Sequence, residues 1–198
     1  MDSRETTKAI FQKFHIHRGD NLPFTGVVST DRTVLAELFC ELGFTKGAEI
    51  GVRAGENAGT LLKRNPNLHL ILVDPWTPFH QCTQEKQDAY YKRCLQTMEP
   101  YANRIEIKKM TSLDAIREVP DESLDFVYID GMHLFDFVMI DIIEWSKKVS
   151  SGGIVSGHDY YHAYAQGVVR AVDAYTLAHN ITNWFITGER YPSYFWVK

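Results

Sequence analysis

The chain has 198 residues, of which 44% are hydrophobic and 23% charged, and its formal net charge is −4. This length and composition are typical of one globular domain that buries its own core. A net negative charge disfavours a nucleic-acid substrate, because binding to phosphate needs clustered basic side chains. No apolar run comes near the roughly 20 residues of a membrane span.

The N-terminus and the cysteines indicate the compartment. The first eight residues are polar and mixed in charge, so they lack the apolar stretch of a secretory signal. Cys40, Cys82 and Cys94 are odd in number, and their spacing fits neither a zinc site nor a CxxC redox pair. We therefore expect a cytoplasmic protein with reduced thiols and no membrane association.

Two regions are predicted along the chain. Residues 1–30 mix aromatic and turn-forming residues, and we expect an N-terminal cap or a segment on the substrate side there. Residues 31–198 alternate helical and strand patterns without a linker or repeat, which predicts one domain. This domain begins with a helix over 31–42, where apolar residues recur at helical spacing.

Seven strands are predicted after that helix, and further helices separate all of them except the last two. This alternation predicts an α/β fold: a Rossmann-like, doubly wound, mostly parallel sheet with helices on both faces and an antiparallel C-terminal hairpin at one edge. The strands are expected at 47–52, 68–73, 105–109, 124–129, 153–156, 183–187 and 193–197. The helices between them are expected at 57–63, 83–101, 112–117, 134–148 and 166–179.

The turn after the first strand reads Glu49-Ile-Gly51-Val-Arg-Ala-Gly55. Ligands of open α/β sheets bind beyond the carboxyl ends of the strands, where glycines let the backbone turn tightly beside a helix N-terminus. The spacing differs from the GxGxxG of dinucleotide folds, and no GKS or GKT follows, so a nucleotide-phosphate cradle is not supported. Asp74 ends the second strand, where a carboxylate can accept hydrogen bonds from both ribose hydroxyls. The plainer alternatives are a pair of Glu49 with Lys46 and a turn cap at Asp74.

These strand-end residues resemble the class I S-adenosylmethionine-dependent methyltransferases. The segments Asp130-Gly-Met-His133 and Gly152-Gly-Ile-Val-Ser-Gly-His-Asp-Tyr160 are similar to the methyltransferase 24 family in particular. The resemblance covers about residues 31–198 and implies that the seven strands lie in the order 3-2-1-4-5-7-6. It implies S-adenosylmethionine as cofactor, with residues around its methionine part (Glu49, Gly51 and Gly55), its ribose (Asp74) and its adenine (Met110, Thr111 and Ser112). Further candidate contacts are Arg53, Asn57 and Asp130.

Polar clusters follow the fourth and fifth predicted strands and should face one crevice. One hypothesis is general-base catalysis, in which His133 or His158 takes the proton of an acceptor hydroxyl and Asp159 or Asp130 orients the imidazole. The other is a divalent metal such as magnesium, held by Asp130, Asp159 and His158, which would bind and acidify a hydroxyl. Metal-dependent small-molecule O-methyltransferases carry Asp-Asn after the fifth strand, and this chain departs from them with His-Asp. The alternatives are purely structural roles: His133 could cap the following helix, and His158 could make a hydrogen bond that fixes its loop.

The sequence thus predicts an S-adenosylmethionine-dependent methyltransferase that acts on a small polar metabolite, more at oxygen than at nitrogen or carbon. One alternative is an NAD-dependent oxidoreductase on the same scaffold, against which the missing third glycine counts. Another is a non-catalytic S-adenosylmethionine-binding module, against which the His and Asp clusters count. The acceptor has no readable motif. A homodimer through C-terminal aromatics is a further option, although burial against the last helix is the commoner fate; these aromatics are Tyr191, Tyr194, Phe195 and Trp196.

Overall fold

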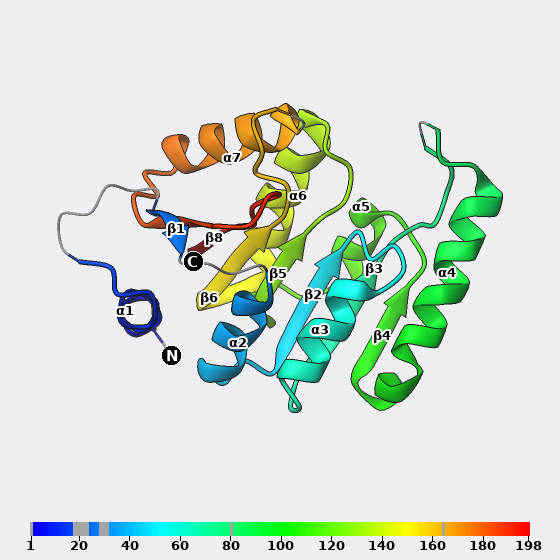
Figure 1. Cartoon of the computed structure of the whole chain (residues 1–198), viewed down its shortest axis with the longest axis horizontal. Coiled ribbons are helices and arrows are strands. Elements are labelled where there is room, and N and C mark those ends of the chain that lie inside the picture. The colour runs from blue at the N-terminus through cyan, green and yellow to red at the C-terminus, as the bar shows by residue number, and fades with distance from the viewer. Residues whose placement is uncertain (1, 18–23, 28–31, 80, 164) are drawn as a thin grey trace.

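One sheet organises the chain. The computed structural model describes residues 2–17, 24–27, 32–79, 81–163 and 165–198, with the backbone alone at 24–27. Eight strands of this part form the sheet, in the order β1-β7-β8-β6-β5-β2-β3-β4 (Figure 1). Their bounds are β1 Phe24–Val27, β2 Lys46–Ile50, β3 His69–Val73, β4 Ile105–Lys108, β5 Leu124–Ile129, β6 Val149–Gly157, β7 Trp184–Thr187 and β8 Tyr194–Val197.

The predicted strand order is confirmed. The seven predicted strands are β2 to β8, and they run from β4 at one edge to β7 in the expected sequence. Strands β2 to β6 pair in parallel, whereas β8 is antiparallel to both β6 and β7. The hairpin does not lie at the edge as expected, because the short strand β1 pairs in parallel with β7 and adds an eighth strand. A strand of four residues leaves too little pattern for a prediction from sequence.

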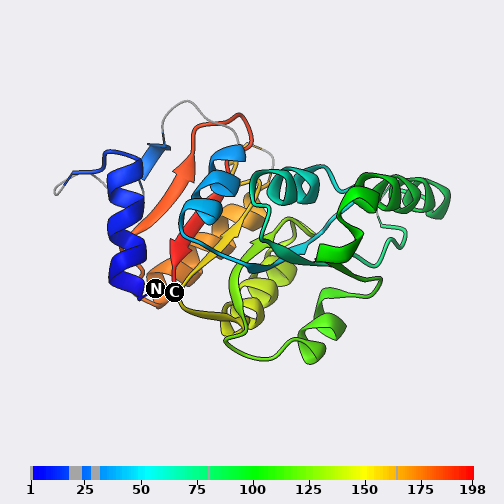
Figure 2. The ribbon, with the colours of Figure 1, turned by 90° about the horizontal axis from the view of Figure 1, so that it is seen from below.

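Helices cover both faces of the sheet (Figure 2). One face carries α1, α2, α3 and α4, and the other carries α5, α6 and α7. Each helix predicted from residue 31 onward is confirmed, with small shifts at its ends; 3₁₀ turns at Glu99–Arg104 and Ile116–Glu118 follow α4 and α5. The bounds are α1 Ser3–Lys13, α2 Thr33–Glu41, α3 Glu56–Arg64, α4 Gln84–Met98, α5 Ser112–Ala115, α6 Phe135–Lys148 and α7 Gln166–Ala178.

The central strands contribute side chains to two separate cores. On β5, Phe126 and Tyr128 pack on the side of α1 to α4, while Val127 and Ile129 pack on the side of α5 to α7. Phe126 stacks on Phe39 of α2, with 4.1 Å between the ring centroids. Because both faces are buried, the strands are apolar throughout, and polar residues are confined mainly to their ends.

Helix α1 was not predicted, although its start carries a clear capping sequence. The Asp2 carboxylate accepts hydrogen bonds from the backbone N–H groups of Arg4 and Glu5, and the Glu5 side chain accepts one from Asp2 N, which completes a capping box. Ile10 and Phe14 of this helix belong to the core on the side of α1 to α4. The helix therefore packs against the sheet beside β6 and β8 and is part of the folded unit.

The aromatic residues of the C-terminal hairpin lie mostly inside the chain. Tyr194, Phe195 and Trp196 are at most 2% exposed, and Trp196 stacks on Tyr175 of α7. Tyr191 alone of the four is exposed. Tyr194 and Trp196 thus lie in the core on the side of α7, which is the commoner fate, whereas Phe195 packs in the core on the other face, against Phe14 of α1. These three buried rings are not available to contact a second copy.

The described helices fall short of the requirements of a membrane-spanning helix. None of them combines the length and the apolar character that crossing a bilayer would need.

Candidate active site

The predicted site residues lie at or near the carboxyl ends of five neighbouring strands, β4, β3, β2, β5 and β6. Gly51, directly after β2, has φ +89°, and a Cβ atom there would lie 2.1 Å from the carbonyl oxygen of Asp130. Only glycine fits this position, because both the backbone angle and the space exclude a side chain. The turn after β2 consequently lies directly against the loop after β5.

Glu49 is the one acidic residue of β2 and is only 1% exposed. Its Oε1 accepts a hydrogen bond from Asn57 Nδ2 of α3 at 3.0 Å, while its Oε2 is buried with no partner. Burial raises the pKa of Glu49 to about 8. This residue is not paired with Lys46, which is exposed at the opposite end of the strand. A buried carboxylate oxygen without a partner is costly, and it is suited to a cationic or N–H donor from a ligand.

Asp74 links the turn after β2 to the loop after β3 through hydrogen bonds. Its Oδ2 accepts a hydrogen bond from Arg53 N at 2.9 Å, and its Oδ1 accepts one from Trp76 N at 2.8 Å. The indole of Trp76 in turn donates to the Arg53 carbonyl at 2.8 Å. The turn-cap interpretation of Asp74 is thus realised, and each carboxylate oxygen still has a second lone pair for a ligand.

Arg53 and Gly55 shape the rest of this turn. Arg53 has φ +54°, and its guanidinium lies over the Tyr90 ring of α4 at 4.7 Å from the centroid. Gly55 has φ +82° and directly precedes α3. The turn therefore presents backbone, the start of a helix and one cationic side chain anchored on an aromatic ring.

The residues predicted for the adenine have distinct surroundings after β4. Met110 packs against the core on the side of α5 to α7. Thr111 caps α5, because its Oγ1 accepts a hydrogen bond from Asp114 N at 3.2 Å. Ser112 Oγ donates to Asp141 Oδ1 and accepts from Trp145 Nε1 at 2.8 Å. The Ser112 hydroxyl is thus fully engaged by two residues of α6.

Asp141 is a buried acidic residue in contact with the predicted site residue Ser112, and sequence analysis missed it. It lies in the middle of α6 and is 6% exposed, and burial raises its pKa to about 6. The only signal for it in the sequence is an acidic residue at a helix position where its neighbours Val138, Ile142 and Trp145 are core residues. Polar residues on a core-facing stripe are unusual enough to be treated as candidates.

Asp130, His133, His158 and Asp159 meet after β5 and β6. His133 Nε2 lies 3.5 Å from Asp130 Oδ1 and 3.3 Å from Asp159 Oδ2. Hydrogen bonding to Asp130 raises the pKa of His133. Burial alone would raise the pKa of Asp130, but its hydrogen bonds with His133 and His158 lower it below the ordinary value. The cluster therefore brings two carboxylates within reach of two imidazoles.

Arg32, a second residue missed by sequence analysis, fixes His158. An Arg32 guanidinium nitrogen lies 2.9 Å from His158 Nε2, and His158 Nδ1 lies 3.2 Å from Asp159 Oδ1. Burial lowers the pKa of His158 and the two carboxylates raise it, to about 9. The Arg32 contact favours the neutral ring nevertheless, because Nε2 can accept this hydrogen bond only when it carries no proton. His158 thus has partners on both nitrogens and is only 6% exposed, so the loop-fixing interpretation describes it well.

Glu189, between β7 and β8, completes the support of Arg32. Its Oε2 accepts a hydrogen bond from Arg32 N at 3.1 Å, and its Oε1 accepts from the hydroxyls of Thr187 and Ser193. No sequence pattern links residue 32 with residue 189. Their proximity arises because α2 begins at the same end of the sheet at which the β7–β8 hairpin turns.

The metal-ligand geometry differs from the predicted set. Ligand atoms of Asp130, His133 and Asp159 lie within 4.8 Å of one another. His133 thus takes the position that was predicted for His158, whose Nε2 faces Arg32. The His133 side chain is 33% exposed and can be reached from the crevice.

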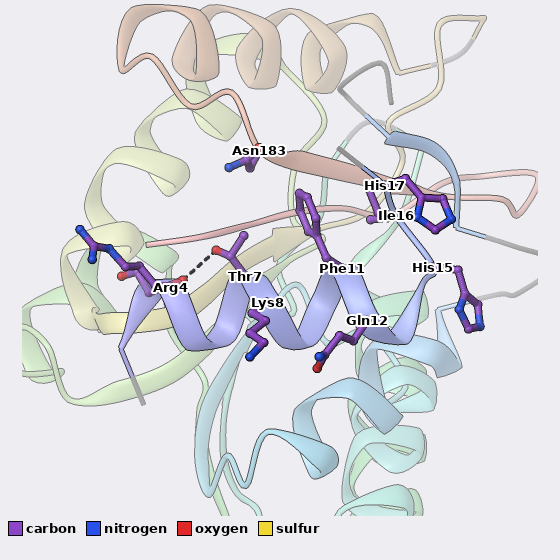
Figure 3. A pocket seen from close by; sticks show the side chains of 10 residues that line it. Arg4, Thr7, Lys8, Phe11, Gln12, His15, Ile16, His17 and Asn183 are labelled. Atoms are coloured by element: carbon purple, nitrogen blue, oxygen red, sulfur yellow. Dashed lines mark hydrogen bonds between the residues drawn. The ribbon is translucent and has the colours of Figure 1, made fainter. Parts of the chain in front are cut away.

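A separate groove runs along α1 (Figure 3). Its volume is about 810 Å³, and its lining includes Thr7, Phe11 and Ile16 of the N-terminal segment and Asn183 before β7. No predicted site residue borders it. It is therefore distinct from the strand-end crevice.

Comparison with known proteins identifies the scaffold. A family model described as a methyltransferase domain, of the methyltransferase 24 family, matches residues 48–160. An uncharacterized protein y4gI of Sinorhizobium fredii is 28% identical over 87 residues, which is 44% of this chain and 10% of that protein. The chain thus spans about a tenth of the length of that curated relative.

Solved structures of low sequence identity share the fold. The O-methyltransferase from Bacillus cereus in complex with SAH has a TM-score of 0.62 at 14% identity, over 98% of this chain and 91% of that one. Cofactor-bound Rv0187 from MTB has a TM-score of 0.63 at 14% identity, over 98% and 89% of the two chains. The precorrin-6y C5,15-methyltransferase from Geobacter metallireducens has a TM-score of 0.57 at 11% identity, over 84% and 86%. Because both an O-methyltransferase and a precorrin C5,15-methyltransferase share this fold, the fold does not choose the acceptor atom.

The match spans the turn after β2, Asp74, residues 110–112 after β4 and the polar clusters after β5 and β6, and it favours a methyltransferase over the NAD-dependent alternative. The chain belongs to the methyltransferase 24 family, whose model is described as a methyltransferase domain.

Proposed function

We propose that this methyltransferase methylates a hydroxyl group of a small polar metabolite bound beyond the ends of β5 and β6. The observation that carries the proposal is the close approach of Gly51 to Asp130, which sets the glycine-bearing turn against the cluster of Asp130, His133 and Asp159. A methyl donor held at the turn would lie beside groups that can orient a hydroxyl and receive its proton. The fit of these two parts supports oxygen as the acceptor atom.

The residues after β2 and β3 fit S-adenosylmethionine. The free, buried Oε2 of Glu49 suits the ammonium of its methionine part, and Asn57 holds the other oxygen so that this one remains free. Gly51 and Gly55 leave the backbone accessible, and Asp74 retains lone pairs for the ribose. When bound, the cofactor supplies an electrophilic methyl group. Contacts of Arg53, Met110, Thr111 and Ser112 with the cofactor remain predictions.

His133 is the proposed general base. It is the more exposed of the two histidines, and its Nε2 lies between the carboxylates of Asp130 and Asp159. These carboxylates would hold the ring and stabilise the imidazolium that forms when the acceptor hydroxyl gives up its proton. His158, whose nitrogens face Arg32 and the carboxylates, would act as a positioning residue for Asp159.

A divalent cation is the second candidate at the same cluster. Two carboxylates and one imidazole within 4.8 Å are a donor set that could hold a divalent cation; the carboxylates suit Mg²⁺, whereas the imidazole better suits a transition metal. Asp130, Asp159 and His133 would hold it, and it would supply Lewis acidity to the bound hydroxyl. His133 cannot be ligand and base at once, so the two candidates make different predictions.

The experiment is an assay of S-adenosylhomocysteine formation with a panel of hydroxylated small molecules and the matching amines, with Mg²⁺ or EDTA. Activity on hydroxyl compounds alone supports the proposal, and activity on amines alone contradicts it. His133→Asn should lower kcat by about 100-fold or more, whereas the control His69→Asn, exposed at the far end of β3, should have no effect. Full activity in EDTA would exclude the metal, and rescue by Mg²⁺ would support it.

The remaining expectations concern the N-terminus and partners. We propose that part of residues 1–30 covers the acceptor, although α1 itself packs on the sheet and residues 18–23 and 28–30 lie outside the described part. A cytoplasmic location, a homodimer and the absence of a nucleic-acid partner stay predictions.

A further inference from the structure

Asp141 lies between the segment after β4 and the loop after β5. Its Oδ1 accepts the Ser112 hydroxyl in the segment after β4. Its Oδ2 lies 3.7 Å from the position that a Cβ atom of Gly131 would occupy in the loop after β5. The helix that carries it covers the same face of the sheet as α5. The absence of a side chain at Gly131 leaves Oδ2 uncovered on that side.

The hydrogen bonding of Asp141 is incomplete. Within the described residues its carboxylate accepts one hydrogen bond, from Ser112, and forms no ion pair. Burial accordingly raises its pKa to about 6. A carboxylate that is 6% exposed needs further donors to offset the loss of water. The Cβ position of Gly131, 3.7 Å from Oδ2 and 4.0 Å from Ile50, is the open space beside it.

The chemistry of the ligand identifies that donor. In the proposed site the ribose lies at Asp74 and the methionine part at Glu49, and the family resemblance implies that the base lies at residues 110–112, where Ser112 contacts Asp141. Adenine presents only acceptors at its ring nitrogens and one donor group, the exocyclic amine. We propose, on the basis of the proposed cofactor site, that Asp141 Oδ2 accepts a hydrogen bond from the exocyclic amine of the adenine and so selects this base.

The test compares two ligands on purified full-length protein by calorimetry. S-adenosylhomocysteine carries the amine, and S-inosylhomocysteine carries a carbonyl oxygen at that position. Wild type should bind the adenosyl compound about 10- to 100-fold more tightly, as expected for a hydrogen bond to a charged group. Asp141→Asn keeps an acceptor for Ser112 and offers an N–H₂ group in place of Oδ2, so it should abolish or invert this preference.

Two further variants separate recognition from folding. The control Asp136→Asn makes the same change at an exposed position of the same helix and should keep the wild-type preference. Gly131→Ala would put a methyl group 3.7 Å from Oδ2 without a clash inside the protein, and it should weaken the adenosyl compound more than the inosyl one even if Asp141→Asn does not fold.

The outcomes are distinct. Failure of wild type to bind S-adenosylhomocysteine would contradict the proposed function itself. Tight binding of both compounds with equal affinity by wild type would overturn the inference alone. An equal loss of both affinities in Asp141→Asn and Gly131→Ala would do the same, because it would assign Asp141 a purely structural role that holds Ser112.

Discussion

Replacing Glu49 by Gln should stabilise the unliganded protein at neutral pH and abolish cofactor binding. The side chain keeps its shape and its hydrogen bond from Asn57 but can no longer ionise. The pKa of Glu49 is about 8 in the folded chain, against an ordinary value of 4.5. Between these two values the unfolded chain releases a proton that the folded chain retains. Wild-type stability therefore falls as pH rises through this window, and the Gln variant lacks this contribution.

The magnitude follows from that window. Each pH unit inside it is worth about 1.4 kcal/mol, so at pH 7 ionisation of Glu49 favours the unfolded wild type by roughly 3 kcal/mol. From pH 5 to pH 7 the difference in unfolding free energy between Gln variant and wild type should therefore grow by about 2 kcal/mol. A constant offset from burying the new amide is expected as well, and it cancels in this comparison.

Urea unfolding of both proteins at pH 5, 6, 7 and 8, followed by tryptophan fluorescence, measures this difference. The exposed Glu99→Gln supplies the control and should show no change with pH. A flat difference between Glu49→Gln and wild type would refute the reasoning, since it would mean that Glu49 ionises normally in the folded chain. Calorimetry with S-adenosylmethionine completes the test: unchanged binding by Glu49→Gln would remove this residue from the cofactor site.

Three further predictions concern single contacts. Gly51→Ala should destabilise the fold by about 3 kcal/mol or more in thermal unfolding, because its Cβ would overlap the Asp130 carbonyl. The control Gly43→Ala, at φ +70° with open space around the Cβ, should destabilise the fold clearly less. Equal destabilisation by the two variants would contradict the predicted overlap at Gly51. Asp2→Ala should cost about 1 kcal/mol through loss of the capping box, and an unchanged Tm would show that α1 does not need it. Arg32→Met should lower kcat about 10-fold at unchanged cofactor affinity, and nitrogen NMR should detect a changed tautomer of His158; an unaltered spectrum would argue against the Arg32 contact.

The sequence by itself determined the scaffold. Continuous apolar strands, helical periodicity and the glycine-bearing turn are local patterns, and they predicted seven strands, six helices and strand ends that carry the polar residues. The turn residues Glu49, Gly51 and Asp74 were readable because a strand-end site depends on chain position as well as on spatial contact. The order of the strands came from the family resemblance, and the structure agrees with it.

Tertiary structure alone decided which polar groups meet. Arg32 and Glu189 come together from opposite ends of the chain, Arg32 contacts Nε2 of His158, and His133 is the more exposed of the two histidines. Asp141 appears in sequence as one acid in an amphipathic helix, and its role depends on its approach to Gly131 and Ser112. Periodicity specifies which face of an element is buried, whereas hydrogen bonds and pKa shifts depend on distances of a few ångströms between residues remote in sequence, which only the packed fold sets.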